Sequence, residues 1–256
     1  MHELLLFGQV PLARHEQVLK ILAGLAAMQP FSYHERRMIL QNLRGAEQSK
    51  PSIKTGSNKP VQASPQVYTQ LIQKLCPTDF SKEILVTKLD SKLSPQQDGT
   101  SPTWISRTQD IPEPEMKTIT IRKVTEDDIS PDAVESYLDL ERYGFLAEFV
   151  LEGHRLICRD IILSLYRVLK LPPQAEGQSN RPTTTLPALE QLGLLDASGA
   201  FVLEACVRVE DRTKPSLVQT ASEELNWLRK EMKGVVDLRA AERLALDTRV
   251  KQRPSG

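Results

Sequence analysis

The sequence predicts an α+β fold, a predominantly antiparallel β-barrel with flanking amphipathic helices. Segments with the two-residue polarity alternation of half-buried strands recur along the chain, and they lack the regular strand-helix alternation of a parallel α/β fold. With 256 residues and 40% hydrophobic content, the chain can bury a substantial core. Because closing a sheet removes its exposed edges, a barrel accommodates many antiparallel strands and a few helices best.

The first expected elements are a strand and a helix. The strand His2–Val10 ends at Pro11, which has no N–H to donate to a neighbouring strand. A helix is expected next, because apolar residues recur every three or four positions and form one stripe that must cover a sheet: Val18, Ile21, Leu22, Leu25 and Met28. Further strands are expected at residues 83–89, 103–107 and 116–124, which alternate in polarity and are rich in β-branched or aromatic residues.

Local signals are densest between residues 130 and 169. Ser130 is placed as a helix N-cap, with Pro131 at the first helical position. Gly144 is expected to be the left-handed residue that ends this helix, followed at once by a strand at residues 145–151. Residues 152–154 are interpreted as a turn that leads into strands at residues 155–159 and 161–169.

The last third of the chain predicts a turn, a strand and a helical segment. The turn at residues 196–199 (DASG) leads into a strand at residues 200–209. The helical segment covers residues 216–249, with a break near Gly234 and a second helix at residues 238–248. Its first helix has an apolar stripe at three- and four-residue spacing: Val218, Ala221, Leu225, Leu228, Met232 and Val235.

We expect the apolar sides of the strands to fill the barrel, with Phe145, Phe149 and Leu163 facing its interior. Recognition is then left to the outer wall and the helices. Trp104 is the candidate partner-binding residue, because tryptophan is enriched among residues that dominate binding energy. Placement of Trp104 in the core is the alternative.

The domain organisation is a single barrel domain over residues 1–256. Segments 45–66, 91–103 and 172–185 lack apolar periodicity and are rich in Pro, Ser, Gln, Gly and Thr, so we expect disordered inserts there. Lys plus Arg and Asp plus Glu each total 33, so no net positive field attracts nucleic acid. A nucleic-acid-binding barrel is kept as an alternative, supported only by Lys50, Lys54 and Lys59 in the first insert.

The three cysteines, Cys76, Cys158 and Cys206, are interpreted as reduced thiols in the core, since no Cys-x-x-Cys pair is present. The apolar run at residues 4–7 is too short for a signal-peptide core, and no segment has the length of a membrane span. We therefore expect an intracellular protein that does not bind membranes.

No motif indicates a catalytic site, a cofactor or a metal. The chain has no Gly-x-Ser-x-Gly, no glycine-rich phosphate loop and no two histidines at metal-binding spacing. A metal-dependent tunnel-type phosphohydrolase, which also uses an antiparallel barrel, needs carboxylates at alternate positions of a strand, whereas Glu3, Glu148 and Glu204 each stand alone. We expect no enzyme, no cofactor and no small-molecule substrate, and keep this phosphohydrolase as an alternative.

Several segments resemble the Mediator subunit 18 family in its fungal version. They are HELLLFGQV with the helix after it, His34-Glu35, TWISR leading into DIPEPE, YGFLAEFVLEGHRL, LEACVRVED, ELNWLRKEMKGVVDL and LALDTR. Together they span most of the chain outside the inserts, and the inserts that begin at Gly45 and Pro172 have no counterpart.

This resemblance implies a non-catalytic scaffold subunit of the Mediator head module, located in the nucleus. It also implies pairing with the similar barrel of Mediator subunit 20 and attachment through a C-terminal helix of Mediator subunit 8. Such a subunit couples transcription regulators to RNA polymerase II and the pre-initiation complex.

Overall fold

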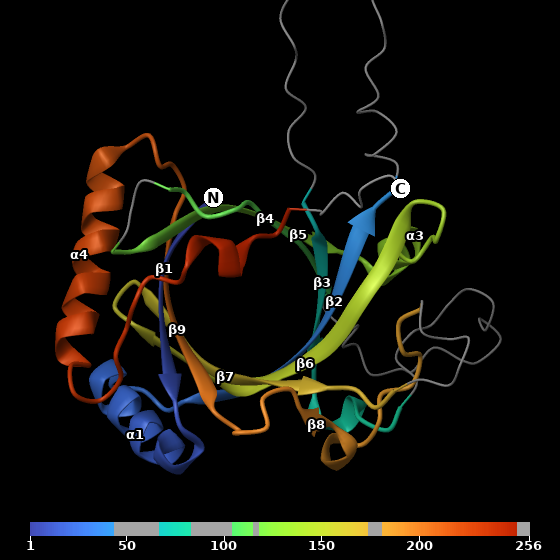
Figure 1. The fold of residues 1–256 in the computed structure, drawn as a ribbon, viewed down its shortest axis with the longest axis horizontal. Helices are drawn as coiled ribbons and strands as arrows, with labels where there is room; N and C mark the ends of the chain where they lie inside the picture. Colours follow the sequence, from blue (N-terminus) through green and yellow to red (C-terminus); the bar gives the residue numbers. More distant parts are fainter. Residues whose placement is uncertain (44–66, 83–103, 115–117, 174–180, 250–256) are drawn as a thin grey trace, which may run out of the picture.

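Eight antiparallel strands close into a barrel in the computed structural model, which describes residues 1–43, 67–82, 104–114, 118–173 and 181–249 (Figure 1). The strand order is β6-β2-β3-β4-β5-β1-β9-β7, and pairing of β6 with β7 closes the circle. A ninth strand, β8, pairs with the end of β7. The strands are β1 His2–Val10, β2 Phe31–Asn42, β3 Thr69–Leu75, β4 Trp104–Gln109, β5 Thr120–Ile129, β6 Tyr143–Cys158, β7 Ile161–Lys170, β8 Gly193–Leu194 and β9 Phe201–Val209. The barrel predicted from the sequence is confirmed.

Three α-helices of the described residues lie outside the barrel: α1 His15–Ala26, α3 Pro131–Tyr137 and α4 Pro215–Glu231 (Figure 1). The N-cap of α3 is Ser130, as predicted, because its hydroxyl accepts a hydrogen bond from the backbone N–H of Ala133. Short 3-10 helices lie at Leu12–Arg14, Pro77–Asp79, Leu189–Gln191 and Arg243–Leu246. No helix in the described part of the chain has the length and hydropathy needed to cross a membrane.

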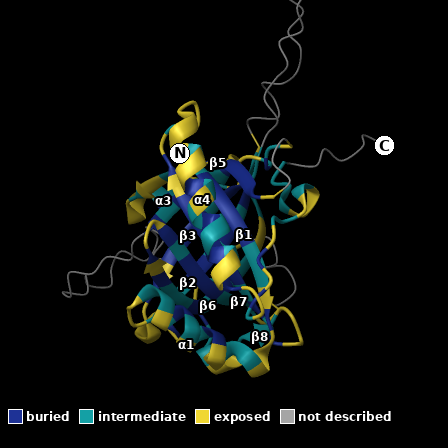
Figure 2. Cartoon of the chain, turned by 90° about the vertical axis from the view of Figure 1, so that its left-hand side faces the viewer, coloured by how far each residue is buried: buried dark blue, intermediate teal, exposed yellow. Residues whose placement is uncertain are grey.

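The main hydrophobic core lies between the outer wall of the barrel and helices α1 and α4. Leu4 and Leu6 of β1 point to the same side as Leu163 of β7, and all three are fully buried. They pack with Leu22 of α1 and Leu228 of α4 in one cluster. Figure 2 shows α4 lying over this buried part of the wall. The apolar face of these strands is therefore the outer one.

A second apolar cluster lies on the outer wall under α3. Its buried members come from β2, β3, β4 and α3: Met38, Leu40, Leu71, Trp104 and Val134. Phe145 of β6 packs against this cluster. Trp104 is 3% exposed, which is the core placement that the sequence left as the alternative.

The expectation of an apolar barrel interior is wrong. Phe145 and Leu163 belong to the outer clusters, and of the three residues assigned to the interior only Phe149 points inward, since it lies directly opposite Arg37 across the β2–β6 pair. The physical reason is that amphipathic helices must cover an apolar wall, and α1 and α4 lie outside the barrel. The strand faces that are left for the interior bear most of the charged residues.

Strand β6 also differs from the prediction. It runs without interruption through residues 152–154, and the turn lies beyond Cys158, where Arg159 has a φ of 55°. Gly153 is needed for close packing instead, because a Cβ at this position would lie 2.3 Å from the carbonyl oxygen of Leu165. Gly144 lies within β6 and does not end α3, which stops at Tyr137.

Other predicted segments have mixed outcomes. Strand β5 lies a few residues further along the chain than the expected strand at 116–124, and β2 and β3 have no counterpart in the prediction. The expected strand at 83–89 and the expected inserts at 45–66 and 91–103 lie outside the described residues. Of the insert at 172–185, the structure describes residues 172–173 and 181–185, and the backbone N–H of Thr183 donates to Glu148 of β6 at 2.9 Å.

The segment after α4, residues 237–249, crosses one end of the barrel and is here called the C-terminal strap (Figure 1). Arg239 exchanges two backbone hydrogen bonds of 2.8 Å with Phe7 of β1. Further along, the backbone N–H of Tyr68, just before β3, donates to the carbonyl of Thr248 at 2.9 Å. The helix expected at residues 238–248 is replaced by this extended chain and one 3-10 turn, Arg243–Leu246, because these contacts need a segment that follows the rim of the barrel.

Candidate functional site

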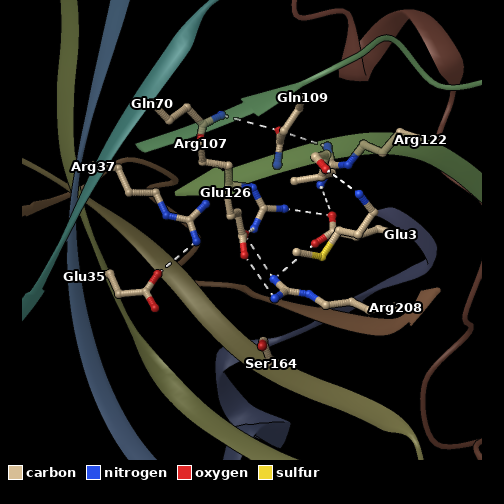
Figure 3. Close-up of polar contacts among 12 residues, drawn as sticks. Glu3, Glu35, Arg37, Gln70, Arg107, Gln109, Arg122, Glu126, Ser164 and Arg208 are labelled. Carbon is tan, nitrogen blue, oxygen red and sulfur yellow. Dashed lines mark hydrogen bonds and ion pairs between the residues drawn. The ribbon is translucent and has the colours of Figure 1, made fainter. Parts of the chain in front are cut away.

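The candidate site is the barrel interior near the end at which β1 begins, here called the N-terminal end. Alternation along the strands points charged side chains inward from five strands that are separated in sequence. Figure 3 shows Glu3, Glu35, Arg37, Arg107, Arg122, Glu126 and Arg208. Glu204 of β9 lines the same interior. Because charges in a barrel interior are partly removed from water, each needs a partner, and the site is built from ion pairs.

Glu3 is the centre of the first network. Its carboxylate, 2% exposed, accepts from the guanidiniums of Arg107 at 2.7 Å and Arg122 at 3.4 Å, and Arg208 lies 3.2 Å from its other oxygen. Glu126 bridges the same neighbours, because it pairs with both Arg107 and Arg208. Two carboxylates therefore form ion pairs with three guanidiniums in this network.

Glu35 is the centre of the second network, on the other side of the interior (Figure 3). Arg37 contacts one of its oxygens at 2.9 Å and Arg155 contacts the other at 3.0 Å. Burial alone would raise the pKa of Glu35, but the two guanidiniums outweigh burial and lower it. Glu35 is therefore ionised at neutral pH, and one carboxylate again serves more than one guanidinium.

Hydroxyl and thiol groups complete the lining. Burial raises the pKa of Tyr33 to about 12, and burial also raises the pKa of Tyr166 and of the Cys206 thiol. The hydroxyl of Tyr166 donates to Glu204 at 3.4 Å. At neutral pH these groups are protonated, so they act as neutral hydrogen-bonding groups and not as nucleophiles.

The two networks enclose a cavity of about 220 Å³. Its lining contains five cationic side chains, which are Arg37, Lys74, Arg107, Arg155 and Arg208, and four carboxylates, which are Glu3, Glu35, Glu126 and Glu204. Solvent reaches the cavity, since the side chains of Arg155 and Arg208 are 36% and 37% exposed. The interior is thus a solvent-accessible, charged chamber with a small excess of positive charge.

The arrangement is a poor metal site. Glu126 and Asp128 occupy alternate positions of β5 and face the same side, a carboxylate pair that was not predicted from the sequence. Glu126 is held by Arg107 and Arg208, however, and Asp128 is exposed at the N-terminal end. Within the described ranges, no three His, Cys, Asp or Glu side chains are grouped so that they could hold a metal ion.

Residues singled out from the sequence are spread over the molecule. Glu204 faces the cavity, whereas Glu148 lies on the outer wall and pairs with the fully buried Arg36. Lys50, Lys54 and Lys59 lie outside the described residues. The interpretation of all three cysteines as core thiols is wrong for Cys76, which is exposed because it follows the last residue of β3.

A larger cavity of about 530 Å³ lies between the C-terminal strap and strands β1 and β9. Asp237 and Arg239 in its lining form an ion pair with each other, and both side chains are more than two-thirds exposed. Because these charged groups are exposed to water, this surface hollow lacks the buried polar groups that fix a ligand in a binding pocket.

Exposed apolar side chains occur at the N-terminal end. Phe31, the first residue of β2, is 68% exposed, and Ile157, near the end of β6, is 56% exposed. Because the β2–β6 register places Phe31 opposite Arg155, Ile157 lies two residues from that pair on the same face of β6. Both side chains are therefore apolar surface at the rim of the barrel.

The chain is similar to one protein family over nearly its full length. A family model described as "Med18 protein" matches residues 2–249. A protein of Aspergillus niger named Mediator of RNA polymerase II transcription subunit 18 is 32% identical over 272 residues, which cover 98% of this chain and 100% of that protein. A protein of the same name from Coccidioides immitis is 30% identical over 271 residues, with 98% of this chain and 100% of that protein covered.

A solved structure supports the fold independently. A chain in the structure of the Schizosaccharomyces pombe Mediator head module superposes with a TM-score of 0.61 at 17% sequence identity. The match covers 94% of this chain and 99% of that chain. The barrel described above is therefore an architecture already seen in an experimental structure.

Proposed function

The chain belongs to the Mediator subunit 18 family, and on this premise we propose that it is a non-catalytic scaffold subunit of the Mediator head module in the nucleus. The matches to fungal relatives and to a chain of the head-module structure support this placement. A scaffold subunit works by presenting rigid surfaces to its neighbours, and a closed barrel with helices packed on its wall is a rigid support.

The proposed partners are the barrel of Mediator subunit 20, as a heterodimer, and a C-terminal helix of Mediator subunit 8. Through them the chain joins the rest of the head module and couples transcription regulators to RNA polymerase II and the pre-initiation complex. Exposed apolar side chains such as Phe31 and Ile157 are a starting point for locating the contact surface, because a partner that covers them buries apolar area.

The observation that supports a non-catalytic role best is the pairing of the interior carboxylates with arginine. Glu3 contacts three guanidiniums, while Glu35 and Glu126 contact two each. A metal-dependent phosphohydrolase needs carboxylates that are free to bind the ion. In this barrel, arginine guanidiniums already pair with the carboxylates that a metal ion would need.

Affinity purification tests the proposed assembly. The chain is tagged at one terminus, expressed in a fungal host at native level and recovered from nuclear extract, with an untagged strain as the control. We expect Mediator subunits 8 and 20 to be recovered in amounts comparable with the bait. Recovery of the tagged chain as a lone monomer, without Mediator subunits, would contradict the proposal.

A hydrolysis assay tests the non-catalytic part separately. The purified chain is incubated with inorganic triphosphate and Mg²⁺ or Mn²⁺, and phosphate release is compared with a Glu126→Gln variant. We expect the two proteins to release phosphate at the uncatalysed rate. Release by the wild type that is lost in the variant would show that the interior is an active site.

A further inference from the structure

We propose that the charged interior of the barrel binds a small multivalent oxyanion of phosphate or diphosphate size. This inference is independent of the scaffold role, because an internal ligand does not require any of the proposed partners. It rests on the size of the cavity, on its charge, and on guanidinium groups that are left with unused donors.

The size and the charge of the cavity select the class of ligand. A cavity of about 220 Å³ is smaller than the roughly 300–1,000 Å³ that is usual for drug-sized ligands, so only a small molecule fits. Five cationic side chains in the lining face four carboxylates, and Arg122 adds a sixth cation behind Glu3. Because the carboxylates are shared among the guanidiniums, a net positive charge is left for a bound anion.

Unused hydrogen-bond donors point to an oxygen-rich ligand. Each guanidinium has five N–H donors. Within the described part of the chain, the Nε–H groups of Arg37, Arg107 and Arg122 are buried and have no hydrogen-bond partner. Arg37 and Arg107 line the cavity from opposite networks, so an anion between them is approached from both sides (Figure 3). Phosphate oxygens accept from such planar donors with favourable geometry.

Two features of the lining oppose an anion and therefore help to test the idea. Glu204 faces the cavity and accepts a hydrogen bond from the neutral hydroxyl of Tyr166 at 3.4 Å. Its charge is therefore less compensated than that of Glu3 or Glu35. Asp128, close to the last residue of β5, adds a second negative charge at the N-terminal end of the barrel, outside the cavity lining. Removing the charge of Glu204 must favour the anion if the anion binds in this chamber.

Isothermal titration calorimetry with inorganic phosphate and pyrophosphate, on the purified full chain at low ionic strength, measures the binding. Arg37→Gln leaves Glu35 paired with Arg155, and Glu204→Gln keeps an acceptor for Tyr166. Arg167→Gln is the matched control, because Arg167 is a half-buried arginine paired with Glu152 on the outer wall. All three variants change the net charge by one unit, and circular dichroism checks that each folds.

We expect saturable binding of pyrophosphate by the wild-type chain that weakens with salt. Arg37→Gln weakens it about tenfold or more, which corresponds to roughly 1.4 kcal/mol or more. Glu204→Gln tightens it, and Arg167→Gln leaves it unchanged. If Arg37→Gln does not fold, tighter binding by Glu204→Gln together with unchanged binding by Arg167→Gln supports the proposal, and equal binding by these two variants overturns it. Absence of binding to the wild type, or equal weakening by Arg37→Gln and Arg167→Gln, would overturn the proposal.

Discussion

Substitution of Glu3 by Gln is expected to destabilise the barrel strongly. Glu3 is 2% exposed and is the only carboxylate that contacts Arg122 among the described residues. After the change, Arg107 and Arg208 keep Glu126, whereas Arg122 keeps the amide oxygen of Gln109, at 3.1 Å, as its one remaining side-chain acceptor in the described part of the chain. A guanidinium that is 7% exposed is then left without a negative partner.

The magnitude follows from the cost of breaking a buried ion pair, which is about 3–5 kcal/mol when one partner is removed. Because glutamine still accepts a hydrogen bond, we expect a loss near the lower end, about 3 kcal/mol. For a chain of this size that loss lowers Tm by roughly 6–12 °C.

Urea unfolding followed by circular dichroism measures this loss. Glu224→Gln is the matched control, because Glu224 pairs at 3.4 Å with Arg159, whose side chain is 51% exposed, and such pairs contribute about 0–1 kcal/mol. The double variant Glu3→Gln with Arg122→Met should recover part of the loss, since the unpaired charge is gone. A loss below about 1 kcal/mol for Glu3→Gln, the range of an exposed pair, would show that Arg122 does not depend on Glu3.

Three further predictions concern other parts of the fold. Gly153→Ala should lower the free energy of unfolding by several kcal/mol, measured in urea, because its Cβ would meet the Leu165 carbonyl oxygen; an unchanged midpoint contradicts this. His34 and Arg167 lower the pKa of Glu152 from 4.5 to about 2, so its ionised form stabilises the fold above about pH 4.5 and this contribution is lost as the pH falls toward 2. Glu152→Gln should therefore reduce the loss of unfolding free energy as the pH falls from about 4.5 toward 2. A pH profile of stability identical to that of the wild type would contradict the pairing. Cys76 should react with a thiol reagent at once and the two buried cysteines slowly, so fast reaction of all three would contradict the described burial.

The barrel was predictable because most of its strands alternate in polarity. His2–Val10 was placed with its correct bounds, and the helix that follows it was identified from its apolar stripe. Strand β2 was missed because Glu35, Arg36 and Arg37 interrupt that alternation. Arg36 points outward to Glu148 while its neighbours point inward, so charges occur on both faces and the two-residue period disappears.

The charged interior was not predicted, because alternation separates two faces of a strand without saying which one is inside. In β1, Leu4 and Leu6 are on one face and Glu3 and Leu5 on the other, and neither face is wholly polar. One signal was available: two amphipathic helices of this kind must cover the outer wall, which therefore has to be apolar. If the apolar faces of the strands point outward to the helices, their charged faces must point into the barrel.

The length of β6 was missed for a different reason. Gly153 followed by a polar residue is a common turn pattern, but glycine also occurs where two strands pack too closely for a side chain. The sequence alone does not distinguish these two uses, because the neighbour that requires the glycine, Leu165, belongs to the next strand.

Arginine side chains neutralise the carboxylates inside this barrel, which leaves no metal site among the described interior residues. A crystal structure of the chain grown with Mn²⁺, with anomalous diffraction data, measures this directly. We expect guanidinium nitrogens within hydrogen-bonding distance of Glu3, Glu35 and Glu126 and no anomalous peak among them. An Mn²⁺ ion bound by two or more of these carboxylates, with the arginines turned away, would contradict it.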